Sequence, residues 1–271
     1  MMNKQINLND YLGVFKTKAG ACFPGDRAIF RGKELHKDFY HADWMELFVF
    51  GITQKRLSAR QVKILHALWV YTSYPDARLW NNRVAALAGT ARSSGALGIS
   101  AAIAVSEATI YGWQAAYEAA DFLERAKALQ DKGKLLADVI KEELAVRPRI
   151  RGWGRPVGAL QEDERIPVML KRMEEEGEPQ GEYLRLAFAI EKELSAMSSR
   201  PLLTTFATVF MAVSLDVGMS AREAYLFLLP CFLAGMPPCY QEACEKPEGA
   251  TFVLPCSQLK YSGPARRNWS G

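Results

Sequence analysis

Histidine, the side chain that most often moves protons near neutral pH, is scarce in this chain of 271 residues. Only His36, His41 and His66 are present, and none of them lies in a glycine-rich loop. The first two lie in a polar segment and are predicted to be solvated, whereas His66 falls in an apolar helical pattern and is predicted to be a hydrogen-bonded core imidazole. A nucleophile motif, a Walker-type phosphate loop and a dinucleotide fingerprint are also missing, which excludes the enzyme classes that these motifs define.

Cysteine and long apolar runs are also limited. The five cysteines are an odd number, and neither their spacing nor the histidines match a zinc site, so we predict reduced thiols and no metal. No apolar run approaches the roughly 20 uncharged residues that a membrane-spanning helix needs, and the N-terminal stretch lacks a signal architecture. These absences predict a cytoplasmic protein with no membrane partner.

The chain has little excess of charge of either sign. Its formal net charge is +4, and the basic residues are spread along the sequence without forming a stripe. A protein that grips phosphate backbones usually concentrates its cationic residues on one face. We therefore expect no nucleic-acid partner.

Helical periodicity dominates the sequence, and strand alternation is almost missing. Apolar residues recur at intervals of three and four, and Ser58 and Ser220 are suitable N-caps for the helices that follow them. A strand is indicated only at 251–259, so the predicted fold class is all-α. The expected helical segments are 41–52, 59–70, 93–112, 113–146 with a break at Lys132 and Gly133, 163–177, 181–197, 202–220 and 221–236.

The segment 93–112, "SSGALGISAAIAVSEATIYG", is almost entirely small and apolar. Small side chains let helices approach closely, and few of these groups can be solvated by water. We expect this helix at the centre of the molecule or of a dimer.

The stretch "RIRGWGRPVG", 149–158, is the most informative local feature. Gly152 and Gly154 can adopt positive φ and can expose backbone N–H groups without a Cβ nearby, which suits an anion or a stacked ring. The same glycines can equally make a tight turn between helices. From the residues alone, both readings stay open.

Several short segments in order resemble the citrate synthase superfamily. The segments are "GDRAIFRGKEL", "WMELFVFGITQKRLS", "ISAAIAVSEATIYGWQA", the glycine stretch with "DER" after it, "VSLDVGMS", "LAGMPPCYQE" and "LKYSGP". The chain length is similar to that of the citryl-CoA lyase modules in this superfamily. The resemblance implies an all-α homodimer with a large helical domain at 1–146 and 201–271. It also implies a smaller mobile helical domain at 147–200.

Enzymes of this superfamily join acetyl-CoA to a 2-oxo acid or cleave the product, so the resemblance implies a coenzyme A thioester and a carboxylate-bearing partner as substrates. Tyr111 and Arg155 stand where the superfamily carries its two catalytic histidines. A phenol can donate a hydrogen bond to an enolate oxygen, but arginine cannot exchange protons near pH 7. Arg165 matches an arginine that binds a substrate carboxylate, and Ser73 lies near the position of a substrate-binding histidine.

The resemblance also implies carrier and substrate contacts elsewhere. Those to the CoA carrier fall on the stretch around the glycines, at Arg151, Gly152, Gly154 and Val157, with Arg149 as a further phosphate ligand. Asn81 and Asn82 lie in a polar segment that we expect beside the substrate.

The superfamily's catalytic aspartate has no counterpart in this sequence. Its position falls at Ala207, with Thr205 or Thr208 within reach of a small shift in alignment. Glu107 and Cys239 are the candidate substitutes for the missing base.

Three hypotheses follow. The first is an enzyme that performs a non-standard condensation or cleavage on an acyl thioester. The second is a catalytically inactive relative that serves as a regulatory or partner subunit, since both histidines and the aspartate are replaced. The third is a helical scaffold for another protein, suggested only by the proline-rich "GMPPCYQEACEKPEG" and the basic C-terminal stretch.

Overall fold

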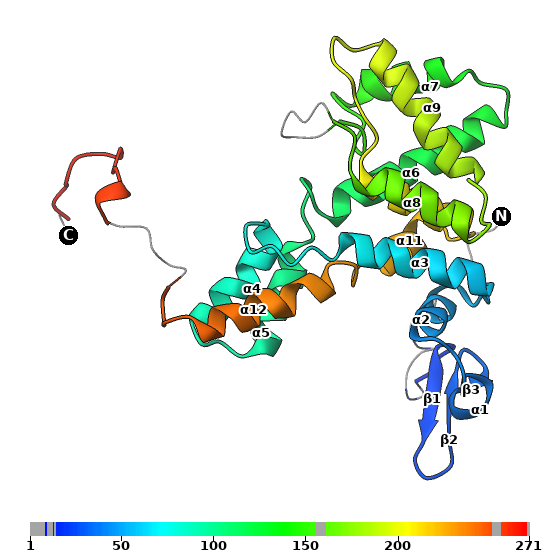
Figure 1. The fold of residues 1–271 in the computed structure, drawn as a ribbon, viewed down its shortest axis with the longest axis horizontal. Helices are drawn as coiled ribbons and strands as arrows, with labels where there is room; N and C mark the ends of the chain where they lie inside the picture. Colours follow the sequence, from blue (N-terminus) through cyan, green and yellow to red (C-terminus); the bar gives the residue numbers. More distant parts are fainter. Residues whose placement is uncertain (1–8, 10–12, 14, 155–160, 251–255, 270–271) are drawn as a thin grey trace. The chain divides into compact units, whose positions relative to one another are not determined.

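The computed structural model describes residues 9, 13, 15–154, 161–250 and 256–269. The chain divides into two compact units, which are described separately below. The first unit contains Met1–Val70 and Gln114–Leu228, and the second contains Tyr71–Trp113 and Leu229–Gly271. Helices dominate both units, so the predicted all-α class is confirmed (Figure 1). Within the described residues, no helix is long and apolar enough to cross a membrane.

The first unit carries most of the helices and a small sheet (Figure 1). Its elements are β1 (Gly20–Phe23), β2 (Arg27–Phe30), β3 (Lys33–Glu34), α1 (Leu35–Asp38), α2 (Trp44–Thr53), most of α3 (Ala59–Thr72), nearly all of α6 (Trp113–Gln130), α7 (Leu136–Val146), α8 (Arg165–Glu175), α9 (Glu182–Ala196), α10 (Phe206–Asp216) and α11 (Ala221–Leu228).

The antiparallel sheet β1-β2-β3 was not predicted from the sequence. Its strands have at most four residues, which is too short for a clear alternation of apolar and polar side chains. An aromatic cluster attaches it to α2: the Phe39 and Phe50 rings lie 5.0 Å apart, and Phe30 lies 6.2 Å from Phe39. A Cβ on Gly51 would come within 2.6 Å of the Phe30 ring, so glycine is needed for this contact.

Polar side chains cap several helices of the first unit. Ser58 and Gln61 exchange hydrogen bonds before α3, and Ser220 and Glu223 do the same before α11, as the sequence predicts for N-caps. Both caps are confirmed.

A more distant side chain caps α9. Asp216, at the end of α10, accepts the N–H groups of Tyr183 and Leu184 at 2.8 and 3.0 Å. Burial raises the pKa of the Asp216 carboxyl against the opposing effect of these two hydrogen bonds. This carboxylate joins two helices that are distant in the sequence.

His66 differs from its prediction as a core residue. Its side chain is 45% exposed, and Nε2 lies 2.7 Å from Oδ1 of Asp43. Asp43 also caps α2 by accepting the N–H of Met45 at 2.8 Å. The error arose because α3 buries Ile64, Leu65 and Leu68 on its inner face and leaves His66 at the edge of that face.

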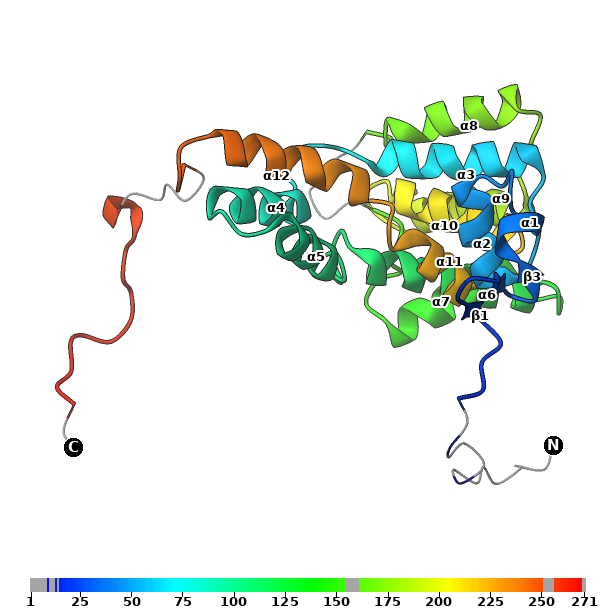
Figure 2. The ribbon, with the colours of Figure 1, turned by 90° about the horizontal axis from the view of Figure 1, so that it is seen from below.

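The second unit is built around three helices. α4 (Trp80–Thr90), α5 (Gly95–Val105) and α12 (Met236–Glu245) lie side by side (Figure 2). Glycines permit their close approach: a Cβ on Gly89 would come 2.4 Å from the Tyr240 carbonyl, and one on Gly98 would come 2.6 Å from the Ala88 methyl. Two 3-10 turns complete the unit, Leu233–Gly235 and Cys256–Gln258. The predicted strand at 251–259 lies outside the described residues at 251–255, and its remainder contains the second 3-10 turn.

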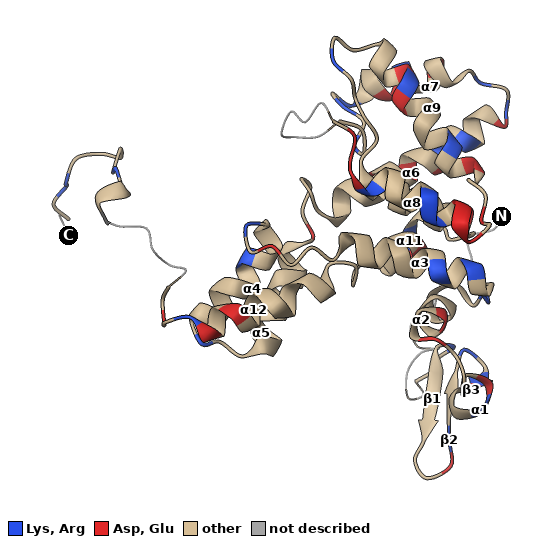
Figure 3. Cartoon of the chain, viewed as in Figure 1, with Lys and Arg blue, Asp and Glu red and all other residues tan. Residues whose placement is uncertain are grey.

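The helix predicted at 93–112 is shorter than expected. It ends at Val105, where the Ser106 hydroxyl donates to the Ala102 carbonyl and the Ser106 carbonyl accepts the N–H of Trp113. Only Gly98 and Ala102 of α5 are buried, whereas Leu97 is 70% and Val105 is 42% exposed. Helix α5 therefore does not lie at the centre of a single chain, and its outer face carries no charged residue (Figure 3).

We predict that Asp43→Ala destabilises the protein by about 1 kcal/mol at pH 7, because the first turn of α2 loses its cap. Burial raises the pKa of Asp43, but the hydrogen bonds from His66 and Met45 outweigh this effect and bring it below its ordinary value of 3.8. The stabilisation by its charge is therefore present above that value and is lost as the pH falls through the folded-state pKa.

Urea denaturation between pH 3 and 7 measures this effect, with Asp43→Asn as the matched control. Asparagine keeps a capping oxygen, so the variant should retain most of the stability at pH 7 and lose the part of the pH dependence that Asp43 contributes. Equal stability of the alanine variant and the wild type would contradict the capping role.

Candidate active site

The glycine stretch of the first unit is attached to the segment that leads into α10. Trp153 and Thr204 form an isolated antiparallel bridge. The Gly154 N–H donates to the Leu203 carbonyl at 2.7 Å, and the Thr205 N–H donates to the Gly152 carbonyl at 2.9 Å. The described part of this loop is therefore held on both sides of Trp153 by backbone hydrogen bonds.

Gly152 and Gly154 are required for packing. Their φ angles are +99° and +79°, a region that favours glycine. A Cβ on Gly152 would come within 2.4 Å of the Thr208 hydroxyl, and one on Gly154 would come within 3.0 Å of the Leu202 side chain. On the Cβ side of Gly152 the side chains of Thr208 and Ala119 fill the space, so the turn itself requires glycine here.

The side chains of Thr208 and Trp153 hold the same loop in place through hydrogen bonds. The Thr208 hydroxyl donates to the Gly152 carbonyl at 2.7 Å and lies 3.2 Å from the hydroxyl of Thr205. The buried Trp153 indole donates to the Ala187 carbonyl at 2.9 Å and meets the Phe122 ring edge-on. Thr205 and Thr208 lie near the expected position of the missing base. Their hydroxyls hydrogen-bond to backbone groups of α10 and of the loop, respectively.

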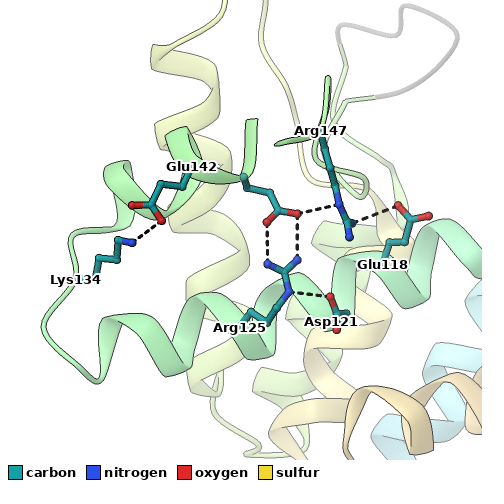
Figure 4. A network of polar contacts seen from close by, with 7 residues as sticks. Glu118, Asp121, Arg125, Lys134, Glu142 and Arg147 are labelled. Atoms are coloured by element: carbon teal, nitrogen blue, oxygen red, sulfur yellow. Dashed lines mark hydrogen bonds and ion pairs between the residues drawn. The ribbon is translucent and has the colours of Figure 1, made fainter. Parts of the chain in front are cut away.

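Arg151, the residue before the first glycine, is engaged in an ion pair. Its Nε lies 3.0 Å from Oε2 of Glu118 on α6, and Arg147 Nη1 lies 4.0 Å from the same oxygen. Arg147 also lies 3.4 Å from Glu143, which pairs with Arg125 through both carboxylate oxygens (Figure 4). The basic segment at 147–151 is therefore tied to α6 and α7.

Arg165 begins α8 and lies over the N-terminal turn of α10. Its Nε and Nη2 donate to the two oxygens of Asp163 at 2.7 Å each, and its guanidinium lies 4.6 Å from the centre of the Phe206 ring. Asp163 is almost fully buried. This bidentate pair, together with the ring, fixes the plane of the guanidinium.

Arg165 and the glycine loop both contact the N-terminus of α10. Arg165 lies over the Phe206 ring, and Gly152 accepts the N–H of Thr205, the N-cap residue directly before Phe206. The N-terminus of α10 carries the positive end of its helix dipole. The first unit thus contains four of the predicted site residues, Arg151, Gly152, Gly154 and Arg165; their role in binding an anion stays a prediction. Arg155 and Val157, two other predicted site residues, lie outside the described residues.

In the second unit, the predicted polar residues make internal hydrogen bonds. The Asn81 amide donates to the Ser106 hydroxyl, and Asn82 donates to the backbone carbonyls of Tyr74 and Asp76. Ser73, half-buried, donates to the Cys231 carbonyl at 3.4 Å. These residues hold the segments around α4 in place.

Tyr111 lies in the turn that follows α5. Its φ is +62°, unusual for a residue with a bulky side chain, and its side chain is half exposed. The next residue must be glycine, since a Cβ on Gly112 would come within 2.5 Å of three backbone atoms. Glu107 is exposed in the same turn, and because α5 has ended it is not one helical turn from Tyr111, as the sequence suggested.

Cys239 is buried on α12, and burial raises the pKa of its thiol. The sequence did not indicate Glu118 or Asp163 as partners of the site arginines. The spacing of Asp163 and Arg165 before a helix is a signal that could have identified one pair, but nothing in the sequence links Glu118 to Arg151.

No protein-family model matches this sequence, and no curated protein matches it. Among solved structures, a citryl-CoA lyase from Hydrogenobacter thermophilus superposes with a TM-score of 0.81 at 16% identity, covering 95% of this chain and 98% of the lyase chain. An ATP citrate lyase from Methanosaeta concilii, in complex with (3S)-citryl-CoA, gives a TM-score of 0.71 at 15% identity over 93% of this chain and 42% of its own.

A third structure is the citrate synthase from Thermoplasma acidophilum, in a ternary complex with carboxymethyl coenzyme A and oxaloacetate. It gives a TM-score of 0.64 at 14% identity over 85% of this chain and 59% of its own. The chain therefore has the citrate synthase fold, as predicted. Within that fold, its extent corresponds to the whole of the citryl-CoA lyase chain and to part of the two larger proteins.

We predict opposite effects from removing two threonine hydroxyls near the loop. Among the described residues, the buried Thr204 hydroxyl has no hydrogen-bond partner, so Thr204→Val should be neutral or stabilising by up to about 1 kcal/mol. Thr208→Val should cost about 1–2 kcal/mol, because the Gly152 carbonyl loses a buried donor.

Urea denaturation of both variants is the measurement, and the two substitutions are matched in type and burial. Equal destabilisation would show that the Thr208 hydrogen bond does not hold the loop.

Proposed function

We propose that this protein binds an acyl-CoA or related acyl thioester and catalyses a non-standard Claisen-type condensation, or the reverse C–C cleavage, with a carboxylate-bearing substrate. The observation that carries the proposal is the superposition of nearly the whole chain on nearly the whole of a citryl-CoA lyase. The ligands named for the other two structures, (3S)-citryl-CoA and carboxymethyl coenzyme A, support a CoA thioester as the substrate class.

The chemistry requires an enolate at the thioester and an acceptor held beside it. Tyr111 is the donor that we assign to the enolate oxygen, since its phenol is exposed and its backbone is fixed by the turn around Gly112. Arg165, oriented by Asp163 over the N-terminus of α10, is suited to a substrate carboxylate. Arg155 would hold a developing oxyanion as a permanent cation.

Removal of the α-proton needs a base, and the two candidates differ. Burial raises the pKa of Cys239, so this thiol stays protonated at neutral pH and is a poor base. Glu107 is an exposed carboxylate in the same turn as Tyr111. We therefore assign proton removal to Glu107.

The carrier would lie along the glycine stretch, with Arg151 near a phosphate and the backbone at Gly152, Gly154 and Val157 beside the carrier. Asn81, Asn82 and Ser73 would shape the substrate side of the site through the backbone segments that they hold. Closure of a small domain at 147–200 over the ligand would exclude water, which strengthens fixed dipoles at the enolate.

The proposal includes a homodimer. The outer face of α5 exposes Ala96, Leu97, Ala101, Ala104 and Val105, and such a continuous uncharged face on a helix is typical of a protein interface. A second copy of the chain would cover this face.

We expect Leu97→Asp to convert the dimer to monomers, because a carboxylate would be buried without a partner. Sedimentation at micromolar concentration measures the change. Leu135→Asp is the matched control, since Leu135 is also 70% exposed, but at the start of α7. A wild-type monomer, or a dimer in both variants, would contradict this interface.

A second candidate function is a catalytically inactive relative that acts as a regulatory or partner subunit. It is favoured by the hydrogen bonds that polar residues of the expected site make to other groups of the protein. Arg165 is paired with Asp163, and Asn81 and Asn82 bond within their own unit. Arg92, from the same polar segment, donates to the carbonyls of Gly89 and Ala243.

Calorimetry with CoA and acetyl-CoA, followed by mass-spectrometric detection of thiol release across 2-oxo acids, tests the proposed function. We expect binding below millimolar concentration and, with at least one acid, a condensed acyl-CoA product, or free CoA once water has hydrolysed the thioester of that product. Tyr111→Phe should lower the rate about 100-fold with unchanged binding, because one donor to the enolate is lost.

Tyr117→Phe is the control for this substitution, since Tyr117 is also partly exposed but contacts Tyr225 on α11. No binding of CoA at millimolar concentration would overturn the proposal. Binding with neither a condensed acyl-CoA product nor free CoA from any 2-oxo acid would favour the inactive relative.

A further inference from the structure

The three arginines before the glycine loop alternate along the chain. Arg147 is extended, with φ of −126° and ψ of 135°, and Arg147, Arg149 and Arg151 are separated by Pro148 and the buried Ile150. Arg147 and Arg151 both reach Glu118, so these two side chains lie on one side of the segment, and Arg149 is exposed between them.

Glu118 is the carboxylate that faces this basic segment from α6. Its Oε2 lies 3.0 Å from Arg151 and 4.0 Å from Arg147, and its side chain is 35% exposed. It therefore pairs closely with Arg151 and more distantly with Arg147, which lies nearer to Glu143 at 3.4 Å, and it remains accessible to solvent and to a solute.

The other carboxylate near this segment is already committed. Glu143 accepts the Nη1 and Nη2 hydrogen bonds of Arg125 at 2.8 and 3.0 Å. Its side chain is only 12% exposed. Arg125 is also bound to Asp121 at 2.9 Å, and these carboxylates raise the pKa of its guanidinium. Displacement of Glu143 would break this inner network, whereas displacement of Glu118 would leave it intact.

We propose that Glu118 is an internal counter-ion that a phosphate monoester displaces from Arg151 and Arg147, so that the segment at 147–151 selects carriers by their phosphate. The inference rests on the proposed function, because it concerns the carrier side of the same site. A phosphate monoester carries nearly two negative charges and three acceptor oxygens, and matches guanidinium groups well. It replaces one carboxylate and gains Arg149 as a further partner.

Glu118 thereby makes the binding affinity depend on whether the ligand carries a phosphate monoester. An anion with one charge, or a carrier without its phosphate monoester, gains little binding free energy from Arg151, because it must first displace the Glu118 carboxylate. Because the pair is partly exposed, we expect the competition to be worth about fivefold in affinity. CoA carries such a 3′-phosphate, and dephospho-CoA does not.

Calorimetry of the full chain with CoA and dephospho-CoA tests this role. Glu118→Gln should tighten CoA binding about fivefold and leave dephospho-CoA within twofold. Arg151→Gln should weaken CoA binding by about tenfold and have a smaller effect on dephospho-CoA. Glu142→Gln is the matched control, because it also removes one negative charge from the unit, at a pair with Lys134 (Figure 4).

A purely structural role for Glu118 predicts a different pattern, in which both carriers weaken together as the loop loosens. Equal affinities of the Glu118→Gln and Glu142→Gln variants for CoA would overturn the inference and leave the proposed function standing. A rise in affinity for dephospho-CoA equal to that for CoA would also overturn it.

Adenosine 3′,5′-bisphosphate separates the two proposals, because it has the monoester without the thioester arm. Its binding, tightened by Glu118→Gln in a protein that binds no CoA thioester, would refute the proposed function and support the phosphate site. Failure of the wild type to bind either CoA or the bisphosphate would refute both.

Discussion

The pairing of residues 152–154 with 203–205 is the constraint on which the candidate site depends. Two backbone hydrogen bonds flank the bridge between Trp153 and Thr204, and the Thr208 hydroxyl adds a third to Gly152. Each is modest by itself, but together they leave little freedom for a turn whose glycines have positive φ. The N-terminus of α10, Arg165 above it and the basic segment before the loop take their positions from this pairing.

Around that pairing, Arg165 and Arg151 are each held by a carboxylate. Asp163 is buried and grips Arg165 through both oxygens, so it orients the guanidinium and is costly to displace. Glu118 is partly exposed and shared between Arg151 and Arg147, so it holds them more weakly. An arginine–carboxylate pair can therefore position a side chain, as at Asp163 and Arg165, or allow the carboxylate to compete with a ligand, as we propose for Glu118 and Arg151.

Sequence reasoning succeeded where the signal was local and repeated. The helical class, the caps at Ser58 and Ser220 and the break near Gly133 follow from periodicity and from polar groups within four residues. It failed at His66, which was predicted to be buried. Periodicity identifies the buried face of a helix, but it does not show which residues lie at the exposed edge of that face. The sheet at 20–34 was missed, since its strands are short and their stability comes from Phe30, Phe39 and Phe50 in contact.

The sequence by itself determined that the chain is helical and indicated that glycines 152 and 154 have a special conformational role. The tertiary structure alone decided what two residues of the glycine stretch touch: Thr208 lies behind Gly152, and Glu118 lies beside Arg151. The physical reason is distance along the chain, because Gly152 and Arg151 meet partners more than thirty residues away. Such contacts arise only when packed helices bring remote side chains together.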